Sequence, residues 1–457
     1  MYDLIVIGAG PGGYVAALEA GRLKLNTLLV EKENIGGVCL NWGCIPTKAI
    51  LHSATIKHLA ESGKRFGITC KDIEVDQGKV QNHKNQCIKR LVTGIKNLLT
   101  DRGVETVFGE AEVVKPGEVR VGEKSYQAKN ILIATGSTPA DIPPARIDRK
   151  YILSSTEALE LDPLPENILI VGGGVIGMEM ARYCATIGTG NTYLVEVLPT
   201  LLPTLEDNQV SEVVTSSLKK MKVKVYTGTA LQKTEIKDGK IHCSFKDMDD
   251  IVADKIILAT GRRPHAKCVE KIQNMEYDKR GHIVIDHLGK TSVPGIWACG
   301  DVTGEPYLAH KASWEAEVVV ATIAGHKVES KNPVIPSCVF FDPEVAMVGL
   351  NPQQAEKANI EYIQGEFPYS AMGKAITEGL RDGFVRILAR KDDHTVIGGQ
   401  IVGCGADLLL NEITLAVKAK LKIEDIAHTI HIHPTLGEVV MEAARDALGE
   451  PLHKTIN

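Results

Sequence analysis

The chain has 457 residues, of which 44% are apolar and 24% charged, with a net charge of −5. It is too long for one ordinary core, so we expect roughly two to four domains. The acidic balance argues against nucleic-acid binding, because no basic surplus can neutralise phosphates. No apolar run approaches the roughly 20 residues that span a bilayer. The start Met1-Tyr2-Asp3 lacks the basic region of a secretory signal. We therefore expect a cytoplasmic protein with no membrane partner.

A dinucleotide-binding pattern opens the chain. A predicted strand at Asp3–Ile7 is followed by a predicted helix at Tyr14–Arg22 and a second predicted strand at Thr27–Val30. The glycines between the first strand and the helix fit G-x-G-x-x-G, at Gly8, Gly10 and Gly13. In this pattern the glycines permit a tight turn, a close pyrophosphate and close helix packing. Glu31 follows the second strand, where a carboxylate would accept hydrogen bonds from a ribose diol. A glycine-rich loop without a ligand is the weaker alternative.

Cys39 and Cys44 are the only close pair among ten cysteines. In an ideal helix their Cα atoms would lie about 8–9 Å apart, whereas a disulfide needs about 7 Å or less. A bridge therefore requires an irregular turn, which Gly43 and Pro46 permit. Pro46 also suits the first turn of a helix through Lys48-Ala49-Ile50-Leu51. Cys44 would then lie at a helix N-terminus, where a thiolate is stabilised. Beside a nucleotide site, two such thiols indicate a redox-active pair.

The remaining eight cysteines are interpreted as small apolar residues. These cysteines are spread along the chain without the density of a disulfide framework. Because we expect no secretory signal, this pattern indicates a reducing compartment. No Cys/His cluster has the spacing of zinc ligands, so we expect no metal site.

The dinucleotide pattern recurs in the second third of the chain. Predicted strands and a helix follow in the same order, at Ile168–Val171, Met178–Ile187 and Thr192–Val195. The glycines are Gly172, Gly174 and Gly177, and the acid is Glu196. A carboxylate there binds the free 2′-hydroxyl of NAD and repels a 2′-phosphate, and no Arg follows it closely. The sequence therefore favours NAD(H) over NADP(H) at the second site.

Two further segments resemble each other, Ile131–Gly136 and Ile256–Gly261. Each is a predicted buried strand that ends in Ala-Thr-Gly, and each lies at the end of one of the two predicted nucleotide-binding units. A later apolar run ends in Gly300-Asp301. Asp301 could accept hydrogen bonds from a ligand's sugar chain, or it could cap the next helix.

We expect an α/β protein with two Rossmann-like domains and a C-terminal α+β domain. The expected boundaries are 1–145 for the FAD domain, 146–266 for the NAD domain, 267–331 for a segment completing the FAD domain, and 332–457 for the C-terminal domain. In the last, predicted strands alternate with helices, at Val345–Val348, Phe384–Leu388, Thr395–Ile401, Ala406–Lys420 and Gly437–Ala447.

These motifs resemble those of the class I pyridine nucleotide–disulfide oxidoreductases over essentially the whole chain. The segment from Gly36 to Lys48 resembles their redox-disulfide signature, and His431-Ile432-His433-Pro434-Thr435-Leu436-Gly437-Glu438 resembles their ending. Within the family, the residues of these motifs are most similar to those of the dihydrolipoamide dehydrogenases. Trp42, Thr47 and Gly437 depart from the usual pattern, and none removes a group that the chemistry needs.

The resemblance implies FAD in the first unit and NAD in the second. The implied cofactor-binding residues are Gly8, Gly10, Gly13, Glu31, Lys32, Gly37, Val38, Lys48, Ala111, Thr135, Gly136, Asp301 and Ala309 on the FAD side, and Gly172, Gly174, Gly177, Glu196 and Gly261 on the NAD side. Lys48 would approach the flavin and pair with Glu179. From the sequence alone, Glu179 is a surface helix acid.

The implied reaction is oxidation of protein-bound dihydrolipoamide with reduction of NAD. His433 would take a thiol proton, oriented by Glu438, and the thiolate would attack Cys39, leaving Cys44 as a thiolate against the flavin. His428 and His431 compete with His433 for the role of base, and spacing does not separate them. In the family this segment reaches the partner subunit's active site, which implies an obligatory homodimer. The implied partners are the lipoyl-bearing acyltransferase core of 2-oxo acid dehydrogenase complexes or the lipoyl carrier of glycine cleavage.

Two alternatives stay open. One is a related NAD(P)H-dependent disulfide reductase or soluble flavoprotein reductase with another substrate. The other is a flavoprotein that acts as a binding or redox-sensing subunit, which would not need the catalytic groups.

Overall fold

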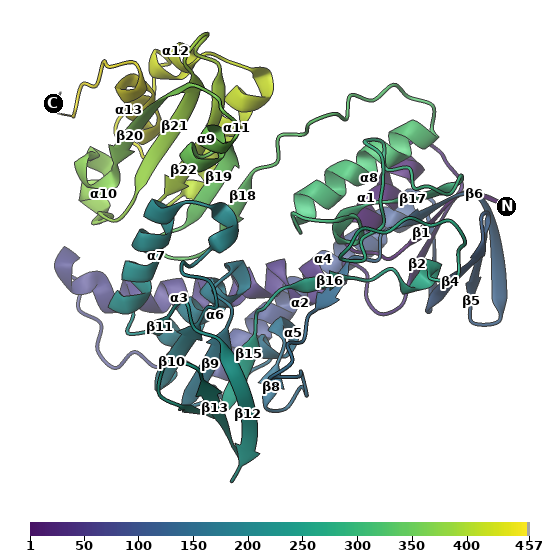
Figure 1. The fold of residues 1–457 in the computed structure, drawn as a ribbon, viewed down its shortest axis with the longest axis horizontal. Helices are drawn as coiled ribbons and strands as arrows, with labels where there is room; N and C mark the ends of the chain where they lie inside the picture. Colours follow the sequence, from purple (N-terminus) through teal and green to yellow (C-terminus); the bar gives the residue numbers. More distant parts are fainter. Residues whose placement is uncertain (455–457) are drawn as a thin grey trace. The chain divides into compact units, whose positions relative to one another are not determined.

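Two units make up the computed structural model, which describes residues 1–454 (Figure 1). Unit 1 consists of residues 1–143, 153–163 and 260–332, and unit 2 of residues 144–152, 164–259 and the chain from 333 onward. The four predicted domain boundaries stay predictions, and residues 455–457 of the predicted C-terminal domain lie outside the described residues. No helix within residues 1–454 combines the length and the apolar composition that crossing a membrane requires.

The large sheet of unit 1 contains the first predicted nucleotide unit. Its strand order is β3-β2-β1-β6-β5-β4, with β17 beside β6. The strands are β1 (Tyr2–Ile7), β2 (Thr27–Glu31), β3 (Glu105–Phe108), β4 (Ala111–Lys115), β5 (Glu118–Val121), β6 (Lys124–Ile133) and β17 (Ile296–Ala298). Strands β1, β2, β3, β6 and β17 are parallel, and β4 and β5 extend β6 as an antiparallel meander.

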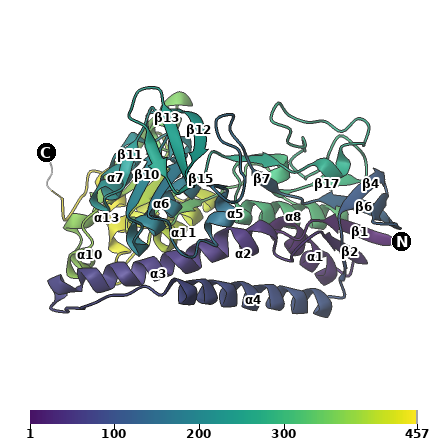
Figure 2. The same cartoon turned by 90° about the horizontal axis from the view of Figure 1, so that it is seen from below.

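Helices and the meander bury the two faces of this sheet. Leu4 and Val6 pack in one core cluster with residues of α1 and α8, while Ile5 and Ile7 pack on the opposite face with residues of β4 and β5. Burial on both faces explains why residues 4–7 of β1 form a continuous apolar run. The helices of unit 1 are α1 (Pro11–Arg22), α2 (Gly37–Trp42), α3 (Cys44–Ser62), α4 (Gln77–Asp101), α5 (Ser155–Ala158) and α8 (Ala309–Ile323). The long helices α3 and α4 lie side by side (Figure 2).

Unit 2 repeats the same nucleotide-binding topology. Its sheet has the order β11-β10-β9-β15-β8, and the parallel strands β11, β10, β9 and β15 match β3, β2, β1 and β6 in unit 1. The elements are β8 (Ile152–Leu153), β9 (Asn167–Val171), α6 (Val175–Ile187), β10 (Asn191–Val195), α7 (Asn208–Lys220), β11 (Lys224–Tyr226) and β15 (Lys255–Leu258). A small antiparallel sheet joins them, formed by β12 (Leu231–Lys237), β13 (Lys240–Phe245) and β14 (Ile251–Ala253). The prediction of two Rossmann-like folds is confirmed.

The C-terminal part of unit 2 is an antiparallel sheet with helices, as the α+β prediction requires. Its strand order is β18-β19-β22-β21-β20, for β18 (Ser337–Val339), β19 (Val345–Gly349), β20 (Tyr362–Pro368), β21 (Phe384–Arg390) and β22 (Val396–Val402). The helices are α9 (Pro352–Lys357), α10 (Gly373–Glu378), α11 (Ala406–Ala419), α12 (Ile423–Ala427) and α13 (Glu438–Ala447). Helix α11 packs on β19 and β22, and α13 packs on β20 and β21.

The two glycine turns have the same close backbone contact. A Cβ atom at Gly13 would lie 1.7 Å from the carbonyl oxygen of Gly8, and one at Gly177 would lie 1.8 Å from that of Gly172. Gly8 and Gly172 have φ angles of +96° and +111°, in the region that favours glycine. In both units, therefore, the helix can approach the preceding strand only because these positions lack side chains.

We expect Gly13→Ala to destabilise the protein by about 3 kcal/mol or more, because its Cβ meets rigid backbone rather than a movable side chain. Urea unfolding measures this loss, and the amount of flavin that copurifies measures the damage to the turn. Gly94→Ala is the matched control, since a Cβ in this position of α4 meets nothing within 4 Å and alanine favours helix. Equal stability of the two variants would contradict the steric role of Gly13.

Candidate functional site

A disulfide joins Cys39 and Cys44, with their Cα atoms 4.6 Å apart. The helix is interrupted between them: α2 ends at Trp42, and α3 begins at Cys44. Gly43 joins the two helices with φ −146° and ψ −109°, which is not helical. The predicted irregular turn is confirmed. The predicted place of Cys44 at a helix N-terminus is confirmed as well.

Close packing holds this break in shape. A Cβ at Gly43 would lie 3.0 Å from the carbonyl oxygen of Val38. The Asn41 side chain donates hydrogen bonds of 2.9 Å and 3.1 Å to the carbonyl oxygens of Gly37 and Ile35. Asn41 therefore links α2 to the loop that precedes it. This link fixes the position of the Cys39 sulfur.

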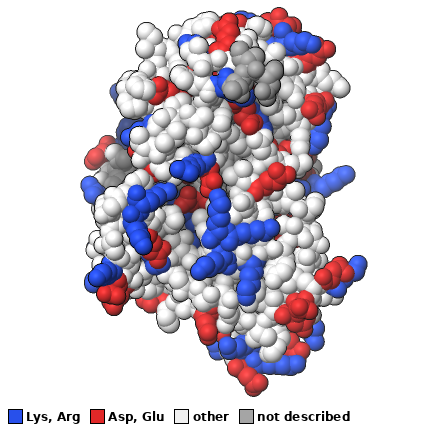
Figure 3. All heavy atoms as spheres, turned by 90° about the vertical axis from the view of Figure 1, so that its left-hand side faces the viewer, with Lys and Arg blue, Asp and Glu red and all other residues white. Residues whose placement is uncertain are grey.

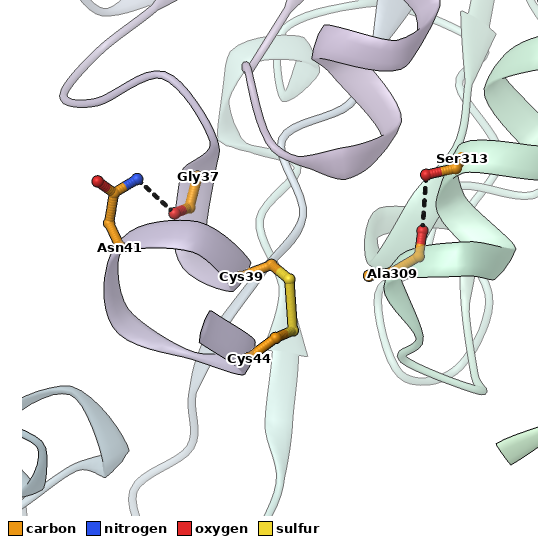
Figure 4. Close-up of a disulfide and its surroundings, with 6 residues drawn as sticks. All are labelled: Gly37, Cys39, Asn41, Cys44, Ala309 and Ser313. Atoms are coloured by element: carbon orange, nitrogen blue, oxygen red, sulfur yellow. Dashed lines mark hydrogen bonds between the residues drawn. A yellow bond between two sulfur atoms is a disulfide. The ribbon is translucent and has the colours of Figure 1, made fainter. Parts of the chain in front are cut away.

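The disulfide is directed toward the start of α8. Figure 4 shows the two sulfur atoms on the side of α2 and α3 that faces Ala309. Ala309 is the first residue of α8, and no side chain caps this helix end. An uncapped helix start presents N–H groups and partial positive charge. Cys44, at the uncapped start of α3, has the same environment.

The first glycine turn forms a cradle for a dinucleotide. Gly10 is the N-cap of α1, no side chain caps that end, and a Cβ at Gly10 would point into open space. Backbone N–H groups of Ala9 and Glu33 donate hydrogen bonds to the two carboxylate oxygens of Glu31, at 2.7 Å and 2.8 Å. These bonds fix the carboxylate beside the turn, where each oxygen can still accept a hydroxyl group.

The second glycine turn repeats this arrangement atom for atom. Backbone N–H groups of Gly173 and Leu198 donate to the carboxylate of Glu196, at 2.6 Å and 2.8 Å. Gly174 is the uncapped N-cap of α6, and a Cβ there would also point into open space. Both sites therefore combine a helix start for phosphates with a fixed carboxylate for a sugar.

The strands that follow the two Ala-Thr-Gly segments pair with each other in unit 1. These strands are β7 (Ser137–Pro139) and β16 (Arg262–Pro264), and their pairing is antiparallel. The Arg262 guanidinium donates to the Ser137 hydroxyl and carbonyl oxygens, at 2.7 Å each, and the Ser137 hydroxyl donates to Asp301. Burial lowers the pKa of Arg262, and the nearby Asp301 and Tyr307 oppose that shift.

The other predicted cofactor residues lie around the same sheet. Lys32 is exposed after β2, Val38 is exposed on α2, and Ala111 is buried at the start of β4. The Thr135 hydroxyl donates to the carbonyl oxygen of His265. Gly136 and Gly261 have positive φ angles at the two chain turns. The cofactor-binding roles of these residues stay predictions.

Glu179 is not a surface acid, and that prediction is wrong. Its side chain on α6 is buried and accepts a hydrogen bond of 3.1 Å from the backbone N–H of Phe340. The tertiary contact overrides the pattern of the isolated helix. Lys48 lies one turn after Cys44 on α3, on the same helix face. Lys48 belongs to unit 1 and Glu179 to unit 2, so their pairing stays a prediction.

His433 and Glu438 are hydrogen-bonded, with 2.9 Å between Nδ1 and Oε1. The second oxygen of Glu438 accepts from the backbone N–H of Thr435 at 2.9 Å. Burial raises the pKa of Glu438, but the hydrogen bonds from Thr435 and His433 outweigh it and hold the pKa below its usual value. The acid is therefore ionised and orients the imidazole, whose side chain is 79% exposed.

The neighbouring histidines are placed differently. His431 uses both ring nitrogens, Nδ1 toward the carbonyl oxygen of Thr429 at 2.9 Å and Nε2 toward Glu412 at 3.1 Å. His428 faces Glu450 at 3.6 Å on the surface. The acid beside His433 lies at 2.9 Å, within hydrogen-bond distance, whereas the acid beside His428 lies at 3.6 Å. The choice of His433 as the base stays a prediction.

Comparison with known proteins identifies the family. Residues 2–316 match the model described as pyridine nucleotide-disulphide oxidoreductase, and residues 335–444 match its dimerisation domain. The chain belongs to the pyridine nucleotide-disulphide oxidoreductase family. It is 40% identical to the dihydrolipoyl dehydrogenase of Geobacillus stearothermophilus and 38% identical to that of Bacillus subtilis, each over 99% of this chain and 97% of the relative.

Solved structures share the fold. LpdA from Mycobacterium tuberculosis superposes with a TM-score of 0.89 at 24% identity, covering 97% of this chain and 99% of that one. The HOCl-induced flavoprotein disulfide reductase RclA from Escherichia coli has a TM-score of 0.86 at 23% identity, covering 97% and 99%. These likenesses support the architecture alone.

The family uses FAD and NAD, and both cradles fit such cofactors. The open space at Gly10 and Gly174, the uncapped helix starts and the fixed acids Glu31 and Glu196 are what a dinucleotide needs. Among residues 1–454, no three His, Cys, Asp or Glu side chains form a group that could hold a metal ion.

Sequence reasoning missed the residues that hold the site in place. Asn41, Ser137 and Arg262 belong to this group. Their signal was positional: Asn41 lies between the two cysteines, and Ser137 and Arg262 each directly follow an Ala-Thr-Gly segment.

We expect the pKa of His431 to lie above its usual 6.5, because Glu412 accepts a hydrogen bond from its ring and outweighs the effect of burial. The pair's contribution to stability is therefore complete below pH 6.5 and is lost as the pH rises through the folded pKa. NMR titration of the imidazole protons measures the midpoint, which Glu412→Gln should lower. Glu424→Gln is the control, since Glu424 faces His394 instead. An equal midpoint in the wild type and Glu412→Gln would contradict this assignment.

Proposed function

We propose that this oxidoreductase is a dihydrolipoyl dehydrogenase, which oxidises a protein-bound dihydrolipoyl group and reduces NAD+. The observation that carries the proposal is the Cys39–Cys44 disulfide next to the first cradle, since Gly36, the N-cap of α2, donates a 2.8 Å hydrogen bond to the Ala9 carbonyl oxygen. Relatives named dihydrolipoyl dehydrogenase match over 99% of the chain. The His433–Glu438 pair supplies the acid–base group that a dithiol substrate requires.

Helix position decides which cysteine the substrate attacks. Attack of a substrate thiolate on the Cys39 sulfur breaks the Cys39–Cys44 bond and expels Cys44 with the electron pair. Cys44 is the better leaving group, because the start of α3 stabilises its thiolate. The second substrate sulfur then attacks the first, which releases the cyclic disulfide and leaves Cys39 reduced. The products are the cyclic disulfide, the Cys39 thiol, the Cys44 thiolate and one released proton, which accounts for both protons of the dithiol.

His433 handles the protons of this exchange. Its Nδ1 bonds to ionised Glu438, so Nε2 can accept a proton from the attacking thiol. Glu438 stabilises the imidazolium that forms, as the acid does in hydrolytic triads. FAD, when bound, supplies a two-electron acceptor between the reduced cysteines and NAD+, which receives the electrons as hydride.

A homodimer completes the site. The match to the dimerisation domain supports it, and so does an apolar surface on unit 2. Ile430 and Ile432 flank the His433 segment at 96% and 79% exposure, and Leu408 and Leu415 on α11 are exposed at 71% and 63%. A surface of this kind favours a protein partner. We place His433 beside the disulfide of the second copy.

The physiological partner we propose is a lipoyl-bearing protein, either the acyltransferase core of a 2-oxo acid dehydrogenase complex or the glycine-cleavage carrier. The face drawn in Figure 3 carries both basic and acidic side chains. The net charge of −5 does not favour a nucleic acid as partner. The cytoplasm is the compartment we propose.

An anaerobic assay of the FAD-loaded protein tests the function. Dihydrolipoamide and NAD+ are mixed with the enzyme and NADH is followed, with NADP+ in parallel. Rapid turnover with NAD+ supports the proposal. Loaded protein that turns over another disulfide but not lipoamide would favour a related reductase, and loaded protein with no turnover would favour a binding or sensing role.

We expect His433→Ala to lower kcat/KM for dihydrolipoamide by about 10²- to 10⁴-fold, the usual range for loss of a general base. Steady-state kinetics measure the loss. His428→Ala is the control, because His428 lies on the surface nearby. A loss of similar size in both variants would remove the special role of His433.

Mixed dimers test whether the site is shared. Cys44→Ser and His433→Ala subunits, each inactive alone, should regain activity after exchange, because one hybrid site then has both groups. Exchange shown by mass spectrometry without any recovery would contradict the shared site.

We expect Glu196→Gln to reduce the preference for NAD+ over NADP+, because the charge that repels a 2′-phosphate is lost while the side-chain shape is kept. The ratio of kcat/KM for the two nucleotides measures this. Glu212→Gln on α7, which replaces an exposed acid of the same unit, should leave the ratio unchanged. An unchanged ratio in Glu196→Gln would show that another group selects the nucleotide.

A further inference from the structure

A short turn carries Asp301 between β17 and the loop before α8. Residues Gly300–Thr303 form a 3₁₀ turn, and Gly304 follows with a φ of +126°. The Asp301 side chain is 25% exposed. A carboxylate on such a turn needs support from outside, because a single 3₁₀ turn is held by few hydrogen bonds of its own.

Two charged residues on α8 hold both ends of this turn. The Glu315 carboxylate accepts a 2.7 Å hydrogen bond from the backbone N–H of Gly300. Lys311, one helix turn earlier, forms a 3.0 Å ion pair with Glu315 and donates a 3.0 Å hydrogen bond to the carbonyl oxygen of Gly304. Both side chains are largely buried, at 9% and 14% exposure. The pair therefore links the residue before Asp301 to the third residue after it.

A second set of contacts holds the Asp301 carboxylate itself. Ser137 donates its hydroxyl proton to Oδ2 of Asp301. The Arg262 guanidinium donates to the Ser137 oxygen at 2.7 Å, which leaves that hydroxyl proton directed toward Asp301, and its Nε lies 4.0 Å from Oδ2. These contacts use one oxygen of Asp301 and leave the exposed edge of the carboxylate for a ligand.

We propose that Lys311 and Glu315, together with Ser137 and Arg262, are positioning residues that set the Asp301 carboxylate against the sugar-alcohol hydroxyl groups of FAD. The inference rests on the proposed function, since it assumes that FAD occupies the first cradle. A buried ion pair is a weak source of stability compared with an apolar pair of the same shape. Its use here is geometric, because it fixes two backbone atoms on either side of one carboxylate.

Binding of FAD and of ADP to the apoprotein separates positioning from general damage. ADP has the adenosine and the two phosphates that the glycine turn and Glu31 would hold, but it lacks the sugar alcohol. Glu315→Gln and Ser137→Ala should each weaken FAD binding about tenfold, the value of one charge-assisted hydrogen bond, and leave ADP binding unchanged. Flavin fluorescence quenching and calorimetry give the two dissociation constants.

Matched controls come from the same elements. Glu317→Gln changes an exposed acid of α8, and Thr138→Ala changes the exposed neighbour of Ser137. Both should bind FAD as the wild type does. Lys311→Met combined with Glu315→Leu removes both charges, so neither is left buried alone. This double variant should keep its thermal stability and ADP binding while FAD binding falls.

Asp301→Asn decides whether these residues act through Asp301. In that background Glu315→Gln should have little further effect on FAD binding, because the carboxylate that it positions is gone. Independent losses that add would overturn the proposal, as would equal weakening of FAD and ADP. If the wild-type apoprotein fails to bind FAD, the proposed function itself fails. If it binds FAD and the variants match their controls, only the positioning role fails.

Discussion

The interruption of the helix at Gly43 is the constraint on which the redox site depends. An unbroken helix would keep Cys39 and Cys44 about 8–9 Å apart, and the break brings their Cα atoms to 4.6 Å. The same break makes Cys44 the first residue of α3. The same break gives the two sulfurs different positions, because Cys44 is the first residue of the 19-residue helix α3, whereas Cys39 is the third residue of the six-residue helix α2. The direction of attack that we propose rests on this difference.

The two nucleotide cradles are nearly identical, so their different uses must come from what surrounds them. Glu31 and Glu196 accept matching pairs of backbone hydrogen bonds. The first cradle has the disulfide and the uncapped start of α8 in its own unit. The second has neither. We therefore expect the cofactor that exchanges electrons with the cysteines in the first cradle and the diffusing nucleotide in the second.

Local patterns in the sequence predicted much of this arrangement, and tertiary contacts account for the rest. The glycine turns, the strands beside them and the irregular turn between the cysteines follow from residue type and spacing alone. The burial of Glu179 does not, because the Phe340 backbone that covers it lies 161 residues away. Ser137 and Arg262 meet only because β7 and β16 pair. Asp301 accepts a hydrogen bond from Ser137, 164 residues away in the chain, a contact that local spacing does not predict.

The histidine segment explains why we propose that catalysis needs two copies of the chain. Ile430 and Ile432 are almost fully exposed on either side of His431, an arrangement that is unfavourable in water unless another surface covers it. His433 follows directly, fixed by Glu438 through one nitrogen and exposed at the other. An oriented base of this kind acts where a substrate thiol arrives to give up its proton. In the proposed dimer a second copy would cover the isoleucines and bring His433 to its disulfide, so this proposal makes association and catalysis depend on the same few residues.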